Sequence, residues 1–537
     1  EAEELYREAL EVYRRLSEEN AETYEPYVAE SCNNLANLLS VLNGKQEAEE
    51  LYREALGIYR RLSEKNAETY ESDVARGCNN LANLLSVLNG KQEAEELYRE
   101  ALGIYRRLLE ENAETYEAYV AESCNNLANL LNSLNGKQEA EELYREALGI
   151  YRRLSEENAE TYEPYVATNC NNLANLLNRL NWRSLNGKRE AEELYREALG
   201  IYRRLSEENA ETYEPYVATS CNNLAILLDS LNQKQEAEEL YREALGIRRR
   251  LSEENAEAYE PYVAGSCSGL AILLDSLNQK QEAEELYREA LEVYRRLSEE
   301  NAETYEPYVA TSCNNLAILL DSLNQKQEAK ELCREALGIY RRLSEENAEF
   351  YEPYVARSCN NLANLLSRLN WRRLNWRQEA EELYREALGI YRRLSEENVE
   401  LYEPCVAGSC NNLAYLLKCL NREQEAEELC REALGIYRRL SEENVELYEP
   451  CVAGSCNNLA YLLKCLNREQ EAEALYREAL GIYRRLSKEN AELYETYVAR
   501  SCSGLAILLD SLNREQEAEE LSQEALGIYQ RLTIITY

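Results

Sequence analysis

The chain has 537 residues, with 100 acidic against 60 basic side chains and a formal charge of −40. This charge repels nucleic-acid phosphates and anionic lipid headgroups, so we expect neither nucleic acid nor membrane as a partner. The sequence contains no His and no apolar run as long as a membrane span, which argues against His-based catalysis, His metal sites and transmembrane helices. We therefore expect no enzyme activity, no cofactor and no metal in this chain.

The sequence repeats itself along its whole length. Near copies of residues 1–10 begin every 46 residues, except that the units starting at Glu139 and Glu328 have 51 residues. Eleven complete units are followed by a final 21 residues. A period of this length predicts a single repeat array over residues 1–537 rather than several globular domains. Because the chain has no Met and begins within a unit, we expect a fragment of a longer protein.

The first half of each unit has a helical pattern, as residues 26–42 illustrate. Pro26 suits the first position of a helix, and all eight prolines occupy this place in their units, after a polar connection over residues 20–25. Apolar residues then recur at spacings of three and four, which predicts one buried stripe: Val28, Cys32, Leu35, Leu39 and Leu42. The opposite face is predicted to hold Glu30, Asn33, Asn37 and Ser40. We expect Asn43-Gly44 to end the helix, with Gly in the left-handed conformation.

The second half of each unit predicts another helix, starting near Gln46. Its buried stripe is predicted to be Ala48, Leu51, Tyr52, Ala55, Ile58, Tyr59 and Leu62. Each unit is therefore an antiparallel pair of helices whose apolar faces are too large to bury alone. Stacked neighbours cover these faces in one continuous core, so the predicted fold is an all-α solenoid.

Two strings in this pair resemble a known family. The pattern N-L-A-x-L-L followed by N-G-x-x-E-A-E-x-L-Y-x-E-A-L, residues 34–56, resembles the tetratricopeptide repeat. The string P-x-V-A-x-x-x-N-N-L-A-x-L-L, residues 26–39, is similar to the kinesin-light-chain type, which is also widespread in bacterial proteins. This unit is longer than is usual for that type, and Cys32 stands where the family has a large apolar residue. The resemblance implies a right-handed superhelix whose concave face, lined by the first helices, binds extended peptides or partner proteins.

An asparagine pair recurs on the polar side of most first helices. Asn is a poor helix former, so its repetition needs a reason. One interpretation is a row of amides that hydrogen-bonds a peptide in the groove, with the first Asn nearer the middle of the polar face. The other is that the amides bond locally or to the neighbouring repeat and hold the stack together. The first asparagines are Asn33, Asn79, Asn125, Asn171, Asn222, Asn314, Asn360, Asn411 and Asn457.

The residue one helical turn further on varies in blocks along the chain. It lies opposite the core stripe, where exposed Ile and Tyr are unexpected for a merely solvated face. The pattern therefore indicates a groove whose chemistry changes along its length, although duplication of neighbouring units explains the clustering equally well. These groove candidates are Asn37, Asn83, Asn129, Asn175, Ile226, Ile272, Ile318, Asn364, Tyr415, Tyr461 and Ile507.

The two five-residue inserts, near 181–185 and 370–374, form basic turns that contain or adjoin all three tryptophans. Trp and Arg anchor interfaces, so one interpretation is a docking or self-association contact. The other is a turn lengthened by local duplication of Leu-Asn-Trp-Arg. The candidate contact residues are Trp182, Arg183, Trp371, Arg372 and Trp376.

Eleven of the 17 cysteines recur at the place of Cys32, and Cys333 and Cys430 replace the core tyrosine. Equivalent helices of stacked repeats lie about 8–10 Å apart, whereas a disulfide needs Cα atoms within about 7 Å. We expect buried free thiols, no disulfides and a reducing compartment such as the cytoplasm.

Taken together, these features predict a protein–protein interaction scaffold that binds extended peptides or partner proteins in the groove of the first helices. One alternative is a structural spacer or self-assembling rod with no groove ligand. Another is the sensor arm of a larger enzyme or regulator whose catalytic domain lies outside this chain. The sequence leaves the identity of the partner and the oligomeric state open.

Overall fold

The computed structural model describes residues 2–42, 44–88, 90–134, 136–180, 185–369 and 374–535. Within these ranges the chain forms 23 α-helices and no β-strand. The helices group into two compact units, Glu1–Ala256 and Glu257–Tyr537. The helices of the first unit are α1 (Ala2–Glu19), α2 (Ala21–Val41), α3 (Lys45–Lys65), α4 (Ala67–Val87), α5 (Lys91–Glu111), α6 (Ala113–Ser133), α7 (Lys137–Glu157), α8 (Ala159–Leu180), α9 (Leu185–Glu208), α10 (Ala210–Ser230) and α11 (Lys234–Glu254).

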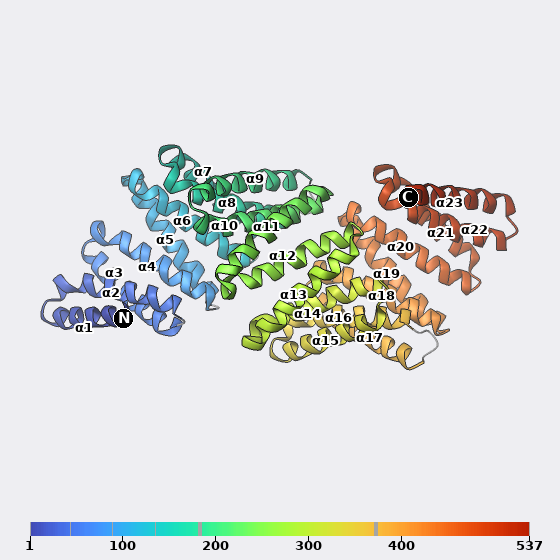
Figure 1. Cartoon of the computed structure of the whole chain (residues 1–537), viewed down its shortest axis with the longest axis horizontal. Helices are drawn as coiled ribbons and strands as arrows, with labels where there is room; N and C mark the ends of the chain where they lie inside the picture. The colour runs from blue at the N-terminus through green and yellow to red at the C-terminus, as the bar shows by residue number, and fades with distance from the viewer. Residues whose placement is uncertain are drawn as a thin grey trace. The chain divides into compact units, whose positions relative to one another are not determined.

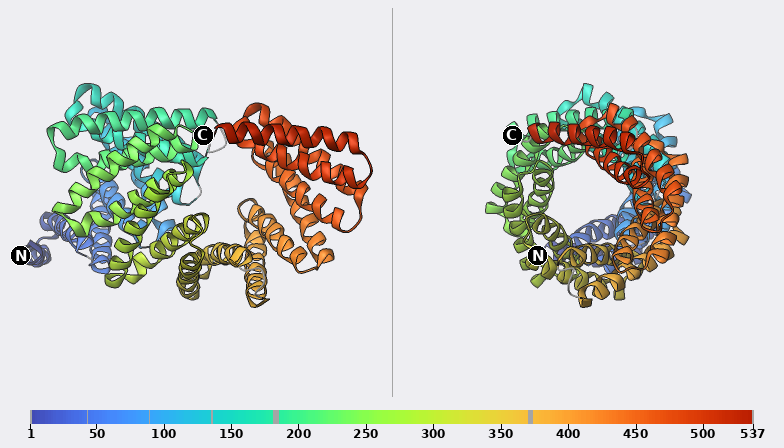
Figure 2. Two further views of the ribbon diagram at one scale, coloured as in Figure 1. Left: turned by 45° about the vertical axis from the view of Figure 1, so that its right-hand side comes forward. Right: turned by 90° about the vertical axis from the view of Figure 1, so that its right-hand side faces the viewer.

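The second unit continues the same alternation of helices. They are α12 (Ala256–Ser276), α13 (Lys280–Glu300), α14 (Ala302–Ser322), α15 (Lys326–Glu346), α16 (Ala348–Leu369), α17 (Leu374–Glu397), α18 (Val399–Cys419), α19 (Glu423–Glu443), α20 (Val445–Cys465), α21 (Glu469–Glu489), α22 (Ala491–Ser511) and α23 (Glu515–Ile535). From α1 to α11 and from α13 to α23, each helix packs against the one before and the one after (Figure 1, Figure 2). Even-numbered helices are the predicted first helices and odd-numbered helices the second, so the predicted all-α solenoid is confirmed.

Each first helix begins five residues before the position that the prolines predict. The side-chain oxygen of Asn20 accepts a hydrogen bond from the backbone N–H of Thr23 at 3.2 Å and caps α2, and Pro26 lies inside the helix. Helix α4 starts at the equivalent place although Ser72 stands where α2 has proline. The asparagine cap therefore sets the start of the helix, and the prediction of a polar connection over residues 20–25 is wrong.

The turn after six described first helices, α10, α12, α14, α18, α20 and α22, is closed by an asparagine in the left-handed conformation. Asn232 has φ 61°, and its N–H donates to the carbonyl of Asp229 at 2.9 Å. The next N–H, of Gln233, donates to the carbonyl of Leu228 at 2.8 Å, which completes a Schellman motif. Gly44 has φ −83°, so the prediction of a left-handed glycine is wrong. Because Asn takes that conformation in these six turns, the following residue can be Gln or Arg.

The core lies between the two helix layers and agrees with the predicted stripes at all but one position. In α3 all seven predicted residues are buried, and in α2 Val28, Cys32, Leu35 and Leu39 are buried. Leu42 is 56% exposed, because α2 ends at Val41 and Leu42 is its C-cap. Each of the eleven equivalent cysteines has no exposed surface, so the thiols act as small apolar core groups.

Ion pairs join successive second helices along the surface. Arg53 Nη1 lies 2.6 Å from Glu93 Oε1, and Arg60 Nη2 lies 2.6 Å from Glu100 Oε2. Equivalent pairs recur in both units, between residues 40 positions apart or 45 across an insert. Within one helix, Arg53 Nη2 also lies 2.9 Å from Glu49 Oε1.

Candidate binding face of the first helices

The even-numbered helices also touch one another along the stack. Helices α4, α6, α8 and α10 do so in the first unit, and α14, α16, α18, α20 and α22 in the second. We call their exposed side the first-helix face and define it by Asn37, Ile226, Ile318, Tyr415 and Tyr461. The predicted groove residues divide between this face and the contacts between neighbouring first helices.

In six repeats the first asparagine of the pair turns toward the next first helix. Asn314 Nδ2, on α14, donates a hydrogen bond of 2.8 Å to Ser358 Oγ on α16. Asn314 is 2% exposed and its Oδ1 is also buried, whereas Asn34, a second asparagine, is exposed. The predicted place of the first asparagine, in the middle of the polar face, is therefore wrong. Equivalent bonds join Asn79 to Ser123, Asn171 to Ser220, Asn360 to Ser409, Asn411 to Ser455 and Asn457 to Ser501.

This Asn–Ser ladder is interrupted in the first unit. Gly77 stands in place of the serine that Asn33 needs, and the Nδ2 of Asn33 is buried without a partner among the described residues. On α8, Asn169 stands where most first helices have this serine. There Asn125 Oδ1, on α6, instead accepts a hydrogen bond from Asn172 Nδ2 at 3.1 Å. These contacts favour the stacking interpretation of the first asparagines, and their part in ligand binding stays a prediction.

The residue one turn further on lies on the first-helix face. Where it is Asn, it accepts a hydrogen bond from a core tyrosine, as Tyr52 Oη donates to Asn37 Oδ1 at 2.5 Å. The same bond joins Tyr98 to Asn83, Tyr144 to Asn129, Tyr195 to Asn175 and Tyr384 to Asn364. Where it is Ile or Tyr, the side chain is exposed, with 52% for Ile318 and 66% for Tyr415. Sequence comparison between units could have found this pairing, since every such Asn is followed by the core tyrosine.

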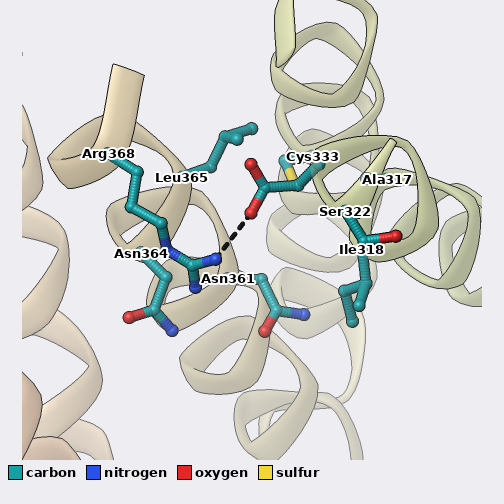
Figure 3. A pocket seen from close by; sticks show the side chains of 9 residues that line it. Ala317, Ile318, Ser322, Cys333, Asn361, Asn364, Leu365 and Arg368 are labelled. Atoms are coloured by element: carbon teal, nitrogen blue, oxygen red, sulfur yellow. Dashed lines mark hydrogen bonds and ion pairs between the residues drawn. The ribbon is translucent and has the colours of Figure 1, made fainter. Parts of the chain in front are cut away.

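A hollow opens on this face where both members of the Tyr–Asn pair are missing. Cys333 stands in place of the tyrosine, Ile318 in place of the asparagine, and a cavity of about 330 Å³ lies between α14, α15 and α16 (Figure 3). Arg368 Nη1 donates to Asp321 Oδ2 at 2.8 Å beside it. The other lining residues are Ala317, Ser322, Asn361, Asn364 and Leu365. Burial raises the pKa of the Cys333 thiol to about 12, so this sulfur is an apolar wall rather than a nucleophile.

A second hollow opens at the other cysteine that replaces the core tyrosine. Cys430 lines a cavity of about 130 Å³ together with Tyr415, Lys418 and Tyr461. Lys418 Nζ lies 3.6 Å from the centroid of the Tyr461 ring, a cation–π contact that holds the ammonium group at the cavity. The sequence showed both Tyr-to-Cys replacements, but it could not show that the neighbouring helices leave the space unfilled.

The insert residues Trp182, Arg183, Trp371 and Arg372 lie outside the described residues. Trp376 is half-buried in α17, where Lys330 Nζ lies 5.2 Å from the centroid of its ring. This tryptophan therefore has a cation–π contact within the chain. A docking role for the inserts stays a prediction.

These features define the class of protein, an α-solenoid built from repeated antiparallel helix pairs. The family model described as "Tetratricopeptide repeat" matches residues 28–66, 74–112, 120–158, 217–255, 263–301, 309–347, 406–444, 452–490 and 498–533. The chain belongs to the tetratricopeptide repeat family, and the resemblance seen in the sequence is confirmed. Members of this family generally mediate protein–protein interactions.

Several solved structures are similar to parts of this chain. BtubC (BKLC) from P. vanneervenii is 25% identical, with a TM-score of 0.38, over 47% of this chain and 91% of that chain. The apo form of RapI is 14% identical, with a TM-score of 0.42, over 59% and 98%. A putative kinesin light chain from Podosopora anserina with nearly identical TPR-like repeats is 22% identical, with a TM-score of 0.33, over 43% and 98%. The comparison with curated proteins gave no match. Among the described helices, none has the length and apolar character needed to cross a bilayer.

Proposed function

We propose that this chain is a scaffold that binds an extended segment of a partner protein on the first-helix face of residues 257–537. Large apolar side chains of that segment occupy the two hollows at Cys333 and Cys430. The observation that carries this proposal is the coincidence of each hollow with an exposed apolar side chain, Ile318 at the first and Tyr415 at the second.

The size of the hollows indicates what fills them. In other repeats a phenol ring occupies the same place and bonds to an asparagine, as Tyr384 does with Asn364. A partner's aromatic or branched aliphatic side chain can replace that ring and bury apolar area, at about 25 cal/mol per Å². The asparagine amides at the hollows, Asn361 and Asn458, can hydrogen-bond the backbone of the segment.

The distance between the hollows sets the spacing of the anchoring residues. The hollows are two repeats apart, and neighbouring helices lie about 8–10 Å apart, so their separation is about 20 Å. An extended chain rises about 3.3 Å per residue. We therefore expect two large apolar residues about six positions apart in the bound segment.

The alternative functions make weaker use of this face. A structural spacer or self-assembling rod gains nothing from exposed Ile318 and Tyr415, because burying them is not needed for stacking. A sensor arm of a larger enzyme or regulator is compatible with the same groove, and the partner segment would then be its signal. Cytoplasmic location, the absence of disulfides and the lack of enzyme activity remain predictions from the sequence.

The test is a selection of peptides from a random displayed library on the intact chain. We expect enrichment of segments with the two-anchor spacing. The double variants Cys333→Tyr with Ile318→Asn, and Cys430→Tyr with Tyr415→Asn, restore the pair that other repeats contain and close the hollows. Their combination should weaken binding of the selected peptides at least tenfold while leaving the helical content unchanged.

A matched control is Cys405→Tyr, which restores the tyrosine that follows proline in most units and lies outside both hollows. This variant should bind the selected peptides as tightly as the unaltered chain. Equal binding by the closed-hollow variants, or a selection without the two-anchor pattern, would contradict the proposal.

A further inference from the structure

Four successive first helices of the second unit carry an apolar residue near their N-terminal end. We call these four residues, Phe350, Leu401, Leu447 and Leu493, the edge row. Phe350, Leu401 and Leu493 are 56%, 58% and 52% exposed, and Leu447 is half-buried. Most repeats in the first half of the chain have threonine at this place, and so does α14, with Thr304. The row lies on the helix edge, away from the hollows and from the predicted groove residues.

Folding does not explain the apolar side chains of the edge row. The helix cap uses the backbone N–H at this position, which donates to the capping asparagine at 3.0 Å in Thr304 and 3.1 Å in Leu401. Thr and Leu therefore cap equally well, and at Phe350, Leu401 and Leu493 most of the side chain stays outside the core. Phe350 lies edge-on to Tyr351, with ring centroids 4.8 Å apart, yet most of its surface remains in solvent.

Duplication of one repeat explains only half of the row. Leu401 and Leu447 belong to nearly identical neighbouring repeats, in which Val399 and Val445 precede them by two residues. Phe350 and Leu493 belong to repeats with alanine at that place. The row therefore combines apolar residues from repeats of three different sequences.

Exposed glutamates flank the edge row at Phe350, Leu401 and Leu447. Glu349, Glu400 and Glu446 precede their row residues directly, and the turns before them add Glu345, Glu346, Glu396, Glu397, Glu442 and Glu443. All nine are exposed, and within the described residues none of them forms an ion pair. By contrast Glu352, three residues after Glu349, pairs with Arg393 at 2.6 Å. A row of apolar side chains flanked by carboxylates is complementary to a partner surface that has apolar side chains flanked by Lys or Arg.

The spacing of the row matches an α-helix. Successive first helices are about 8–10 Å apart, and residues seven apart in an α-helix are separated by about 10.5 Å along its axis. A partner helix of about 22 residues, with apolar residues at every seventh position, can therefore place one of them on each member of the row. We propose that the edge row is a docking site for a basic amphipathic helix of a partner protein.

The proposal is tested with three synthetic peptides of about 25 residues on the intact chain, long enough for four apolar residues seven positions apart. One places Leu at helical spacing among Lys, one is a scrambled sequence of the same composition, and one has Glu in place of Lys. The scrambled peptide measures non-specific attraction to the acidic chain. We expect the amphipathic basic peptide to bind at least tenfold more tightly than the scrambled one, and the acidic peptide not to bind. Equal binding of the first two peptides overturns the proposal.

Two variants locate the site. Restoring the threonine of other units in F350T/L401T/L447T/L493T should reduce the preference for the amphipathic peptide to less than twofold without altering the melting temperature. The variant E349Q/E400Q/E446Q keeps the apolar row and should weaken binding of the basic peptide severalfold. A preference that survives both variants overturns the proposal.

A matched control separates this site from the proposed groove. The variant I272N/I318N/I507N removes exposed apolar surface from the first-helix face and should leave the peptide preference intact. Loss of the preference in this control places the peptide in the groove and overturns the edge site. A dimer of the unaltered chain that F350T/L401T/L447T/L493T dissociates, measured by sedimentation, identifies a second copy as the occupant and also overturns it.

Discussion

Asn314 and Ser358 join two neighbouring repeats through one buried hydrogen bond, from the amide Nδ2 to the hydroxyl Oγ at 2.8 Å. Both side chains are buried, so water does not compete for the bond. The same pair of residue types recurs down the second unit, where it fixes how one first helix meets the next.

Replacing Asn314 by alanine should lower the free energy of unfolding by about 1 kcal/mol, because the buried hydroxyl of Ser358 loses its partner. The measurement is urea unfolding followed by circular dichroism. The chain contains its own control, Asn33, whose Nδ2 has no partner because Gly77 replaces the serine. Asn33→Ala should change stability by less than about 0.5 kcal/mol. Equal losses in the two variants would show that the bond contributes nothing.

Gly77→Ser should stabilise the chain by about 1 kcal/mol, from helix propensity and a new bond to Asn33. A Cβ at Gly77 would lie 3.4 Å from Leu56 Cδ1, an ordinary van der Waals contact, so the serine fits. A double-mutant cycle with Asn33→Ala separates the two contributions. If the gain is as large without Asn33, the new bond does not form.

The ion pairs between second helices predict a dependence of stability on pH. The hydrogen bonds from Arg53, Arg99 and Arg288 lower the pKa values of three exposed glutamates, Glu93, Glu139 and Glu328, below the ordinary 4.5. Because the pKa is lower in the folded state, the stabilisation is present above pH 4.5 and is lost as the pH falls through the lowered values. The pairs are exposed, so each contribution is small.

The variant E93Q/E139Q/E328Q should therefore melt at a lower temperature than the unaltered chain at pH 7. The difference should shrink below pH 4.5 and disappear once the carboxylates of the unaltered chain are protonated. Comparing the two proteins at each pH cancels the relief of repulsion among the other acidic groups. A difference that stays constant down to pH 2 would assign the loss to packing instead of charge.

Thiol labelling should divide the cysteines by burial. Cys465 is exposed, whereas burial raises the pKa of the Cys124 thiol to about 12. At pH 7 N-ethylmaleimide should modify Cys465 first, and Cys124 only after unfolding in urea. Peptide mapping by mass spectrometry measures both rates. Similar rates at the two thiols in the native protein would contradict the buried position of Cys124 and its equivalents in the other repeats.

The fold was predictable because apolar spacing alone specifies the helix pairs. The stripe from Ala48 to Leu62 is buried as predicted, and the repeat length indicated the solenoid. The start of each first helix was not predicted correctly, because a proline signal at Pro26 competes with a capping signal at Asn20, and the cap prevails. The Arg–Glu pairs could not be predicted, because residues 40 positions apart meet only after the repeats stack.

The candidate site was predicted less completely than the fold. Ile318 and Tyr415 are exposed as the pattern indicated, since they lie opposite the core stripe. Asn314 is buried because the next first helix covers that side of α14, and the approach of that helix depends on packing that one repeat does not reveal. The hollow at Cys333 depends in the same way on neighbours that do not move in to fill it.

The interruption at Gly77 has a consequence for cooperativity. In a repeat array the coupling between neighbours determines how far local opening spreads. Four consecutive Asn–Ser bonds couple α14, α16, α18, α20 and α22, so these helices should exchange their amide hydrogens as one block. The junction between α2 and α4 lacks that bond, so α2 should be coupled more weakly to the helices that follow it and should exchange its amide hydrogens sooner than they do.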